Sequence, residues 1–335
     1  MTSVQRLMSA EEIALSQVSG PAFVRMPDGA ARFAERASRL DALAPGNPMQ
    51  AYLALVAEVA RAQAAVVEHD FGAASLPDET ALAHAAEHLM PPIPVASWRR
   101  DPVWRRMLAM LVDTIERASP AAAAAPETRT VLARLRSADD AWLEDQANRI
   151  LNDRELELDK GAAVFIGAAL QVYWIWMLRA LGEKPVGRLA TPTLCPCCGS
   201  RPVASIVRSS GDGSHRYLAC RLCATEWYYE RIKCPTCEST AGIEYVQLDE
   251  GGDAASVDPG ALGARAASGA TVKAETCSAC QTYTKIVAGD RVPGAEPVAD
   301  DLASLALDVT LAEQTGFMRA TLNLALFPGH ADDAD

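Results

Sequence analysis

Several features are absent from this chain of 335 residues, and each absence excludes a class of function. No cysteine precedes Cys195, so the first half has no thiol for a disulfide, a metal or a nucleophile. Neither a Gly-rich phosphate loop nor a G-x-S-x-G nucleophile elbow occurs, and we find no other catalytic signature. A basic surplus is also missing, because 31 Lys and Arg stand against 43 Asp and Glu, a net charge of −12. The chain as a whole therefore repels a nucleic acid.

Signals for export and membrane insertion are weak. The segment Met1–Glu12 has no apolar stretch and no small-residue cleavage site, so we expect a cytoplasmic protein. One apolar run, Gly161–Leu178 (GAAVFIGAALQVYWIWML), is uncharged and just long enough to span a bilayer. It stands alone, contains two glycines and Gln171, and lies between Lys160 and Arg179. These features favour a buried core helix over stable membrane insertion.

The residues up to about 182, called the helical half below, carry helical signals. They are rich in Ala, Leu, Glu and Arg, which are good helix formers. Apolar residues recur at three- and four-residue spacing along 49–69, 103–115 and 131–150, which predicts a helix with one buried face in each stretch. Proline and glycine clusters such as 27–29 and 91–94 separate the helices, and no strand-like alternation competes. The pattern predicts an N-terminal α-helical bundle.

Composition changes at 182–187 (GEKPVG), a linker by its glycine and proline content. Beyond it the pattern predicts short strands, a helix over Val298–Glu313, and an irregular apolar tail that ends at Phe327-Pro328-Gly329. A long acidic, Gly-rich loop is expected over 249–269. The strands are expected at Val203–Arg208, His215–Ala219, Thr225–Lys233, Ile243–Leu248, Thr271–Thr276 and Thr282–Val287.

Eight of the nine cysteines form four C-x-x-C pairs, and this spacing predicts metal binding. Two thiolates in one tight turn can face a single ion, and two such turns complete a tetrahedral S₄ site. Disulfides are disfavoured by the reducing compartment expected, and a thioredoxin-like pair would need one C-x-x-C opening a helix. The candidate ligands are Cys195, Cys198, Cys220, Cys223, Cys234, Cys237, Cys277 and Cys280.

The strands between the pairs indicate which pairs combine. The first two C-x-x-C pairs, and likewise the last two, form cysteine turns that face each other across a hairpin, as in zinc ribbons and rubredoxins. We therefore expect the two pairs within Cys195–Cys223 to form one site and the two pairs within Cys234–Cys280 to form a second. Interleaved pairing of the four pairs is the alternative. Cys197 is the spare cysteine, because its place in the middle of a C-x-x-C turn should point its side chain away from the ion.

These patterns predict an α+β multidomain fold. An N-terminal α-helical bundle occupies 1–186, and two tandem rubredoxin-like or zinc-ribbon units occupy 187–233 and 234–290. A C-terminal helix and tail follow over 291–335. The units have few apolar residues to bury, so the metal should hold them together. S₄ geometry accepts both iron and zinc.

A second candidate metal motif lies in the helical half. His84-Ala85-Ala86-Glu87-His88 matches the H-x-x-E-H pattern of inverted zinc peptidases. No third ligand can be identified from the sequence, and the motif lies at the end of an Ala-rich stretch that runs into Pro91-Pro92. Surface histidines are the favoured interpretation.

The motifs of the second half resemble the bacterial formate dehydrogenase accessory protein family, FdhE. The resemblance covers roughly the last 140 residues and includes all four cysteine pairs, whereas the helical half agrees only in type. One residue departs from the family pattern, because Cys197 stands where an apolar or small residue is commoner. The resemblance lies in CPCCGSRPVASIVR (195–208), RYLACRLCATEWYYERIKCPTCE (216–238), VKAETCSACQTYTKI (272–286) and VADDLASLALD (298–308).

The resemblance implies a cytoplasmic maturation factor for respiratory, exported formate dehydrogenases. Such a factor binds iron in two rubredoxin-like units and acts on the catalytic subunit before export. It is not an enzyme and not part of the finished one. Two alternatives stay open: a redox protein that passes electrons to or from that client through S₄ iron, and a zinc-ribbon nucleic-acid binder. The segment 191–290 has 9 basic and 11 acidic residues, so we expect no nucleic-acid partner. A homodimer remains open.

Overall fold

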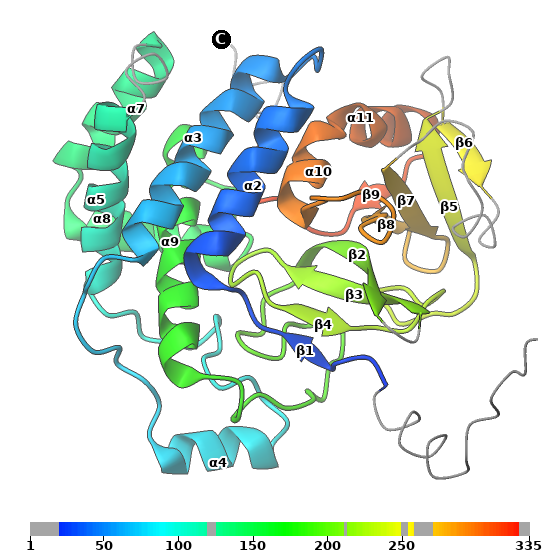
Figure 1. Cartoon of the computed structure of the whole chain (residues 1–335), viewed down its shortest axis with the longest axis horizontal. Coiled ribbons are helices and arrows are strands. Elements are labelled where there is room, and N and C mark those ends of the chain that lie inside the picture. Colours follow the sequence, from blue (N-terminus) through cyan, green and yellow to red (C-terminus); the bar gives the residue numbers. More distant parts are fainter. Residues whose placement is uncertain (1–19, 119–124, 211–212, 249–253, 258–270, 328–335) are drawn as a thin grey trace, which may run out of the picture.

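The computed structural model describes residues 20–118, 125–210, 213–248, 254–257 and 271–327. Helices dominate this part of the chain up to Leu181, and strands dominate from Pro202 onward (Figure 1). The helices are α2 (Gly29–Leu43), α3 (Gln50–Val67), α4 (Glu79–Glu87), α5 (Val103–Ala118), α7 (Pro126–Ser137), α8 (Asp140–Leu151), α9 (Lys160–Leu181), α10 (Pro297–Ala303) and α11 (Leu305–Gln314).

The strands are short and follow the hairpins expected from the sequence, with β1, β6 and β9 as additions; β6 lies inside the stretch where a loop is predicted, and β9 lies in the tail predicted to be irregular. The rest of that loop, together with residues 1–19 and the Pro328-Gly329 end of the tail, lies outside the described residues. The strands are β1 (Val24–Arg25), β2 (Pro202–Ser210), β3 (Gly213–Cys220), β4 (Glu226–Tyr228), β5 (Ile243–Leu248), β6 (Ala254–Val257), β7 (Val272–Cys277), β8 (Thr282–Val287) and β9 (Met318–Arg319).

Helix α9 is the centre of the helical half. It starts where the side chain of Asp159 accepts a hydrogen bond from the amide of Ala162, and it ends at Gly182 with φ +74°. Its buried residues surround the whole helix, which is the pattern of a core helix. The helix is long and apolar enough to cross a membrane, yet 89% of its most apolar window is buried within the protein. The structure therefore places it in the core, where α3, α5, α7 and α8 pack around it.

All described strands belong to one mixed sheet. Its order is β1-β4-β3-β2-β8-β7-β5-β6, and β9 pairs with β8. The two cysteine-bearing hairpins meet at β2 and β8, which run parallel with Ser205 opposite Ile286 and Ile206 opposite Val287. The two units expected in tandem are thus joined through backbone hydrogen bonds into one continuous sheet.

Two predicted helices are each divided in the structure. The stretch Val131–Ile150 forms α7 and α8, because the side chain of Asp139 accepts a hydrogen bond from the amide of Trp142 and caps a new helix. The stretch Val298–Glu313 forms α10 and α11, with a break at Ser304. A three-to-four-residue period continues through such a break, so periodicity alone does not reveal it.

Two strand predictions are also wrong in detail. Only Glu226–Tyr228 of the predicted strand Thr225–Lys233 is extended in the sheet, because the chain turns through Ile232, with φ +54°, into the next cysteine pair. The helical half is not free of strands either. Val24 in β1 pairs with Trp227 in β4, so a segment from the N-terminal side forms one edge of the sheet (Figure 1).

The helical half and the first cysteine-bearing hairpin share one hydrophobic core. Trp104 and Trp174 from the helices belong to the same buried cluster as Leu218 and Trp227 from the sheet. The linker at 182–187 therefore marks a change of secondary structure across which the two parts pack together. The division of the chain into four domains stays a prediction.

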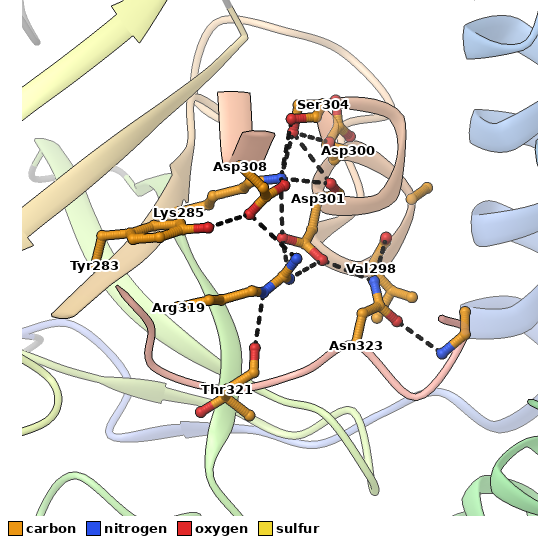
Figure 2. Close-up of polar contacts among 12 residues, drawn as sticks. Tyr283, Lys285, Val298, Asp300, Asp301, Ser304, Asp308, Arg319, Thr321 and Asn323 are labelled. Atoms are coloured by element: carbon orange, nitrogen blue, oxygen red, sulfur yellow. Dashed lines mark hydrogen bonds and ion pairs between the residues drawn. The ribbon is translucent and has the colours of Figure 1, made fainter. Parts of the chain in front are cut away.

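Buried ion pairs hold the C-terminal segment against the sheet (Figure 2). Asp301 in α10 is fully buried and accepts hydrogen bonds from Arg319 in β9. The ammonium group of Lys285 in β8 pairs with Asp308 in α11 and lies 3.5 Å from Asp301. The hydroxyl of Tyr283 donates to Asp308 at 2.6 Å. These contacts join α10, α11, β8 and β9 through their charged side chains.

A second set of buried pairs joins the same segment to the helical half. Arg39 in α2 contacts Asp300 at 2.6 Å, and Arg36 contacts Glu296 at 3.2 Å. The buried carboxylates of Asp300 and Asp301 are therefore both engaged in ion pairs inside the fold.

Candidate metal centres

The eight paired cysteines lie in two groups of four. In each group the four Sγ atoms lie within 4.8 Å of one another. The first cluster is Cys195, Cys198, Cys220 and Cys223, and the second cluster is Cys234, Cys237, Cys277 and Cys280. This is the sequential grouping that the hairpins predict.

The sulfur–sulfur distances fit a tetrahedral thiolate site. Three sulfur pairs in the first cluster are 3.5–3.6 Å apart and two pairs in the second are 3.7 Å apart, and all pairs lie within 4.8 Å. Four sulfurs at about 2.3 Å from a central ion stand roughly 3.8 Å apart, whereas a disulfide brings two sulfurs to about 2.05 Å. The residues present therefore fit a zinc or iron ion in each cluster, and ligation itself remains a prediction.

The local backbone explains how each pair presents two thiols to one point. The amide of Gly199 donates to the carbonyl of Cys195 at 2.8 Å, and the amide of Glu238 donates to Cys234 at 3.0 Å. Each turn is closed by a residue in the left-handed region, which reverses the chain within the turn. The left-handed residues after the four pairs are Gly199, Ala224, Glu238 and Gln281, with φ of 71°, 56°, 62° and 56°.

The first cluster is enclosed by protein. All four of its cysteines are buried, and burial raises the pKa of the Cys195 and Cys198 thiols well above the usual value. Four thiolates in such surroundings require a compensating cation, because an isolated buried charge is costly. A zinc or iron cation supplies part of that compensation, and deprotonated cysteine is the form that binds it.

The helical half covers the first cluster through backbone groups as well as apolar side chains. The amide of Val95, between α4 and α5, donates to the carbonyl of Cys198 at 2.7 Å. The side-chain amide of Gln171 in α9 donates to the carbonyl of Arg221 at 2.7 Å. Both cysteine turns of this cluster are therefore held by residues of the helical half.

The second cluster lies at the surface. Cys234 and Cys277 are buried, Cys280 is half-buried, and Cys237 is exposed. Exposed Met318 lies beside this cluster, since its amide donates to the carbonyl of Gln281 at 3.0 Å. The two clusters thus share one turn geometry but differ in their contact with solvent.

Cys197 lies next to the first cluster and outside the group of four. Its Sγ is 3.7 Å from the sulfur of Met26 and accepts a hydrogen bond from the hydroxyl of Thr225 at 3.4 Å. That hydroxyl in turn accepts one from Cys223 at 3.2 Å. A buried thiol one hydrogen-bonded group away from a ligand fits the role of spare cysteine, which stays a prediction.

The histidine motif of the helical half is also brought together. His84 and Glu87 lie on α4 and His88 is its C-cap residue; their ligand atoms lie within 4.8 Å of one another, and all three side chains are exposed. Among the described residues, no further metal-ligating side chain joins the two histidines and Glu87 in this group. A peptidase site needs a further ligand and a cleft for the peptide, so surface histidines remain the favoured interpretation.

One connection between the two cluster-bearing hairpins has little trace in the sequence. Arg216 in β3 is almost fully buried and contacts Glu275 in β7 at 2.8 Å, and Tyr245 donates to the other oxygen of Glu275 at 2.7 Å. The hydroxyl of Tyr229 donates to the carbonyl of Cys234 at 2.9 Å, so this aromatic residue also contacts the second cysteine-bearing unit. Two opposite charges at inward strand positions are the signal that could have indicated the ion pair.

Fold and clusters together define the class of this protein: a mixed α/β protein with two four-cysteine clusters suited to metal ions. Three family models match consecutive parts of the chain. "FdhE, N-terminal" matches residues 21–191, "FdhE, central domain" matches 194–231, and "FdhE, C-terminal domain" matches 232–326. The chain belongs to the FdhE family, as its cysteine motifs predict.

Relatives match along most of their length. "Protein FdhE homolog" of Pseudomonas aeruginosa is 38% identical over 298 residues, which are 89% of this chain and 90% of that protein. "Protein FdhE" of Escherichia coli O1:K1 / APEC is 34% identical over 301 residues, 89% of this chain and 88% of that protein. The crystal structure of the FdhE protein from Pseudomonas aeruginosa is similar with a TM-score of 0.76 at 36% identity, covering 92% of this chain and all of that one.

Proposed function

We propose that this protein is a non-enzymatic accessory factor for a respiratory formate dehydrogenase. It acts in the cytoplasm on the catalytic subunit, before that subunit is exported, and its two Cys₄ clusters hold one iron ion each. Membership of the FdhE family supports this role, because the resemblance to that family implies a formate dehydrogenase accessory protein.

The observation that carries the proposal is the closure of both clusters. Each contains four thiols at tetrahedral spacing. A metal with four protein thiolates has no open position for a substrate, whereas a catalytic metal keeps one. An ion in either cluster would therefore hold two cysteine turns together, and the turns would shape the surface offered to the client.

Co-purification tests the proposal. A tagged form of the full chain is expressed together with a respiratory formate dehydrogenase, and the catalytic subunit is expected to elute with it. The control uses the same enzyme with a variant whose Cys195 and Cys198 are both serine, which should recover less of the subunit. Recovery of a different client, with no formate dehydrogenase, would contradict the proposal.

The nature of the metal is tested by elemental analysis of the purified chain. Two ions of iron per chain are expected, with the red colour of ferric thiolate. If the chain instead contains two zinc ions, is colourless and still supports maturation, the metal is zinc and an electron-transfer role is excluded.

One observation favours the redox alternative as a second candidate. The exposure of Cys237 would bring an iron ion in the second cluster close to the surface, where a partner could exchange an electron with it. A reversible one-electron potential that shifts when the client binds would support this function. A cluster that is colourless, or that shows no reversible one-electron potential, would contradict this function.

A further inference from the structure

The two clusters are matched copies of one turn geometry in two different surroundings. In sequence, Cys195-Pro196-Cys197-Cys198 corresponds to Cys234-Pro235-Thr236-Cys237. In the fold, Cys198 and Cys237 are each followed by a left-handed residue, and the carbonyls of Cys195 and Cys234 accept the same amide hydrogen bond. Any difference in behaviour must therefore arise from what covers each cluster.

The first cluster is closed on both of its turns by the helical half. Amides of Ile93 and Val95 donate to the carbonyls of Cys197 and Cys198 at 3.3 and 2.7 Å. Gln171 in the core helix α9 holds the opposite turn. For an external ligand to reach these sulfurs, the helical half must first separate from the sheet, and such an opening of a packed core is rare.

The second cluster has no such requirement, because two of its cysteines already meet solvent. Cys237 is exposed and Cys280 is half-buried, whereas their counterparts Cys198 and Cys223 are buried. A small soft donor, such as a thiolate, can approach the Cys237 side without any rearrangement of the fold.

We infer that the second cluster is the exchangeable one, and that ligand exchange begins at Cys237. In that exchange Cys237 would leave the ion, an external thiolate or chelator would take its place, and the freed Cys237 thiolate would take a proton from water. No oxidation or reduction is involved. The first cluster stays closed throughout and serves as the permanent link between the helical half and the sheet. The inference rests on the proposed binding of metal by both clusters.

Alkylation of the metal-loaded full chain tests the order of exposure. The protein is treated with N-ethylmaleimide, and the modified cysteines are identified by peptide mass spectrometry over time. Cys237 is expected to react first and Cys280 next. The four cysteines of the first cluster should remain unmodified until the ion of that cluster has itself been lost. Equal labelling of Cys198 and Cys237 would overturn the inference.

Metal release gives an independent measurement. With excess 4-(2-pyridylazo)resorcinol as chelator, the chain should release one ion at least about a hundredfold faster than the other, because the slow ion awaits an opening of the core. Cys237→Ser should remove the fast phase and leave the slow one. The matched variant Cys198→Ser should remove the slow phase. Release of both ions at one rate from the wild-type chain would overturn the inference without affecting the proposed metal binding.

Absence of any bound metal in the purified and reconstituted chain has a different meaning. It would contradict metal binding itself, and the inference with it. Co-purification with the client is measured separately, so failure of the client proposal leaves the release and alkylation results interpretable.

Discussion

The amide of Val95 donates a 2.7 Å hydrogen bond to the carbonyl of Cys198, and this contact joins the helical half to the first cysteine turn. The two residues are far apart in sequence, and their contact brings the segment before α5 over one side of the first cluster. Pro91, in the same segment, lies against Gly199. The stability of the first cluster should therefore depend on contacts with the helical half, which can be tested at this point.

Substitution Gly199→Ala should destabilise the chain through that contact. A Cβ at position 199 would lie 3.2 Å from Cγ of Pro91, and φ is +71°. Glu238, at the equivalent place in the second cluster, tolerates a φ of 62°, so the backbone conformation alone does not demand glycine. We expect the free energy of unfolding, measured with urea, to fall by about 2 kcal/mol, because left-handed strain and overpacking act together.

Gly46→Ala is the matched control for this prediction. Its φ is +76°, in the turn closed by the hydrogen bond from the amide of Asn47 to the carbonyl of Ala44, and nothing lies within 4 Å of an added Cβ. Only the backbone strain applies there, so a loss of about 1 kcal/mol is expected. Equal losses at positions 46 and 199 would show that Pro91 has no part in the effect.

Cys197→Ala should leave the metal content of the purified chain unchanged, whereas Cys198→Ala should lose one ion. Cys197 lies outside the group of four thiols and packs against Met26. Elemental analysis of both variants and the wild type checks the prediction. Loss of an ion from Cys197→Ala would mean that this thiol is a ligand.

Glu275→Gln should weaken the connection between the two hairpins. Glu275 and Arg216 are buried and 2.8 Å apart, and the variant leaves the guanidinium without a negative partner. Breaking a buried pair from one side costs about 3–5 kcal/mol, which urea unfolding can measure. The control is Glu116→Gln, which removes an exposed partner of Arg136 and should cost less than about 1 kcal/mol. A similar small loss from both variants would contradict the prediction.

Asp301→Asn should lower stability at neutral pH and have less effect in acid. Burial alone would raise the pKa of Asp301, but the charges of Arg319 and Lys285 outweigh it and hold the pKa below its ordinary value. A lowered folded-state pKa contributes stability above the unfolded pKa of about 3.9, and this contribution is lost as the pH falls through the folded value.

The measurement for Asp301 is the difference in unfolding free energy between wild type and variant at several pH values. A difference of about 3 kcal/mol is expected at pH 7, and it should shrink below about pH 4. Taking the difference cancels the loss of metal in acid, which affects both proteins alike. A difference that is constant over the whole pH range would disprove the role of the Asp301 charge.

Much of the fold follows from local pattern. The strands Ile243–Leu248 and Thr282–Val287 lie where alternation and turn residues predict them, because both signals act within a few residues. The same patterns do not predict the division of Val131–Ile150 into α7 and α8, since a cap at Asp139 interrupts the helix without interrupting its apolar period. They do not predict strand β1 either, because two residues are too few to show a period, and Val24 belongs to a strand only through its pairing with Trp227.

The sequence by itself determined the eight candidate ligands and their grouping, because C-x-x-C spacing and the hairpins between the pairs are local properties of the chain. Only the tertiary structure decided the difference between the clusters. Burial of Cys198 and exposure of Cys237 depend on whether the helical half packs over the turn, and that packing joins residues as distant as Val95 and Cys198. The same holds for Arg216 and Glu275, whose strands come together only when the hairpins form one sheet through β2 and β8. Spacing selects the atoms that bind a metal, and long-range packing sets their access to solvent.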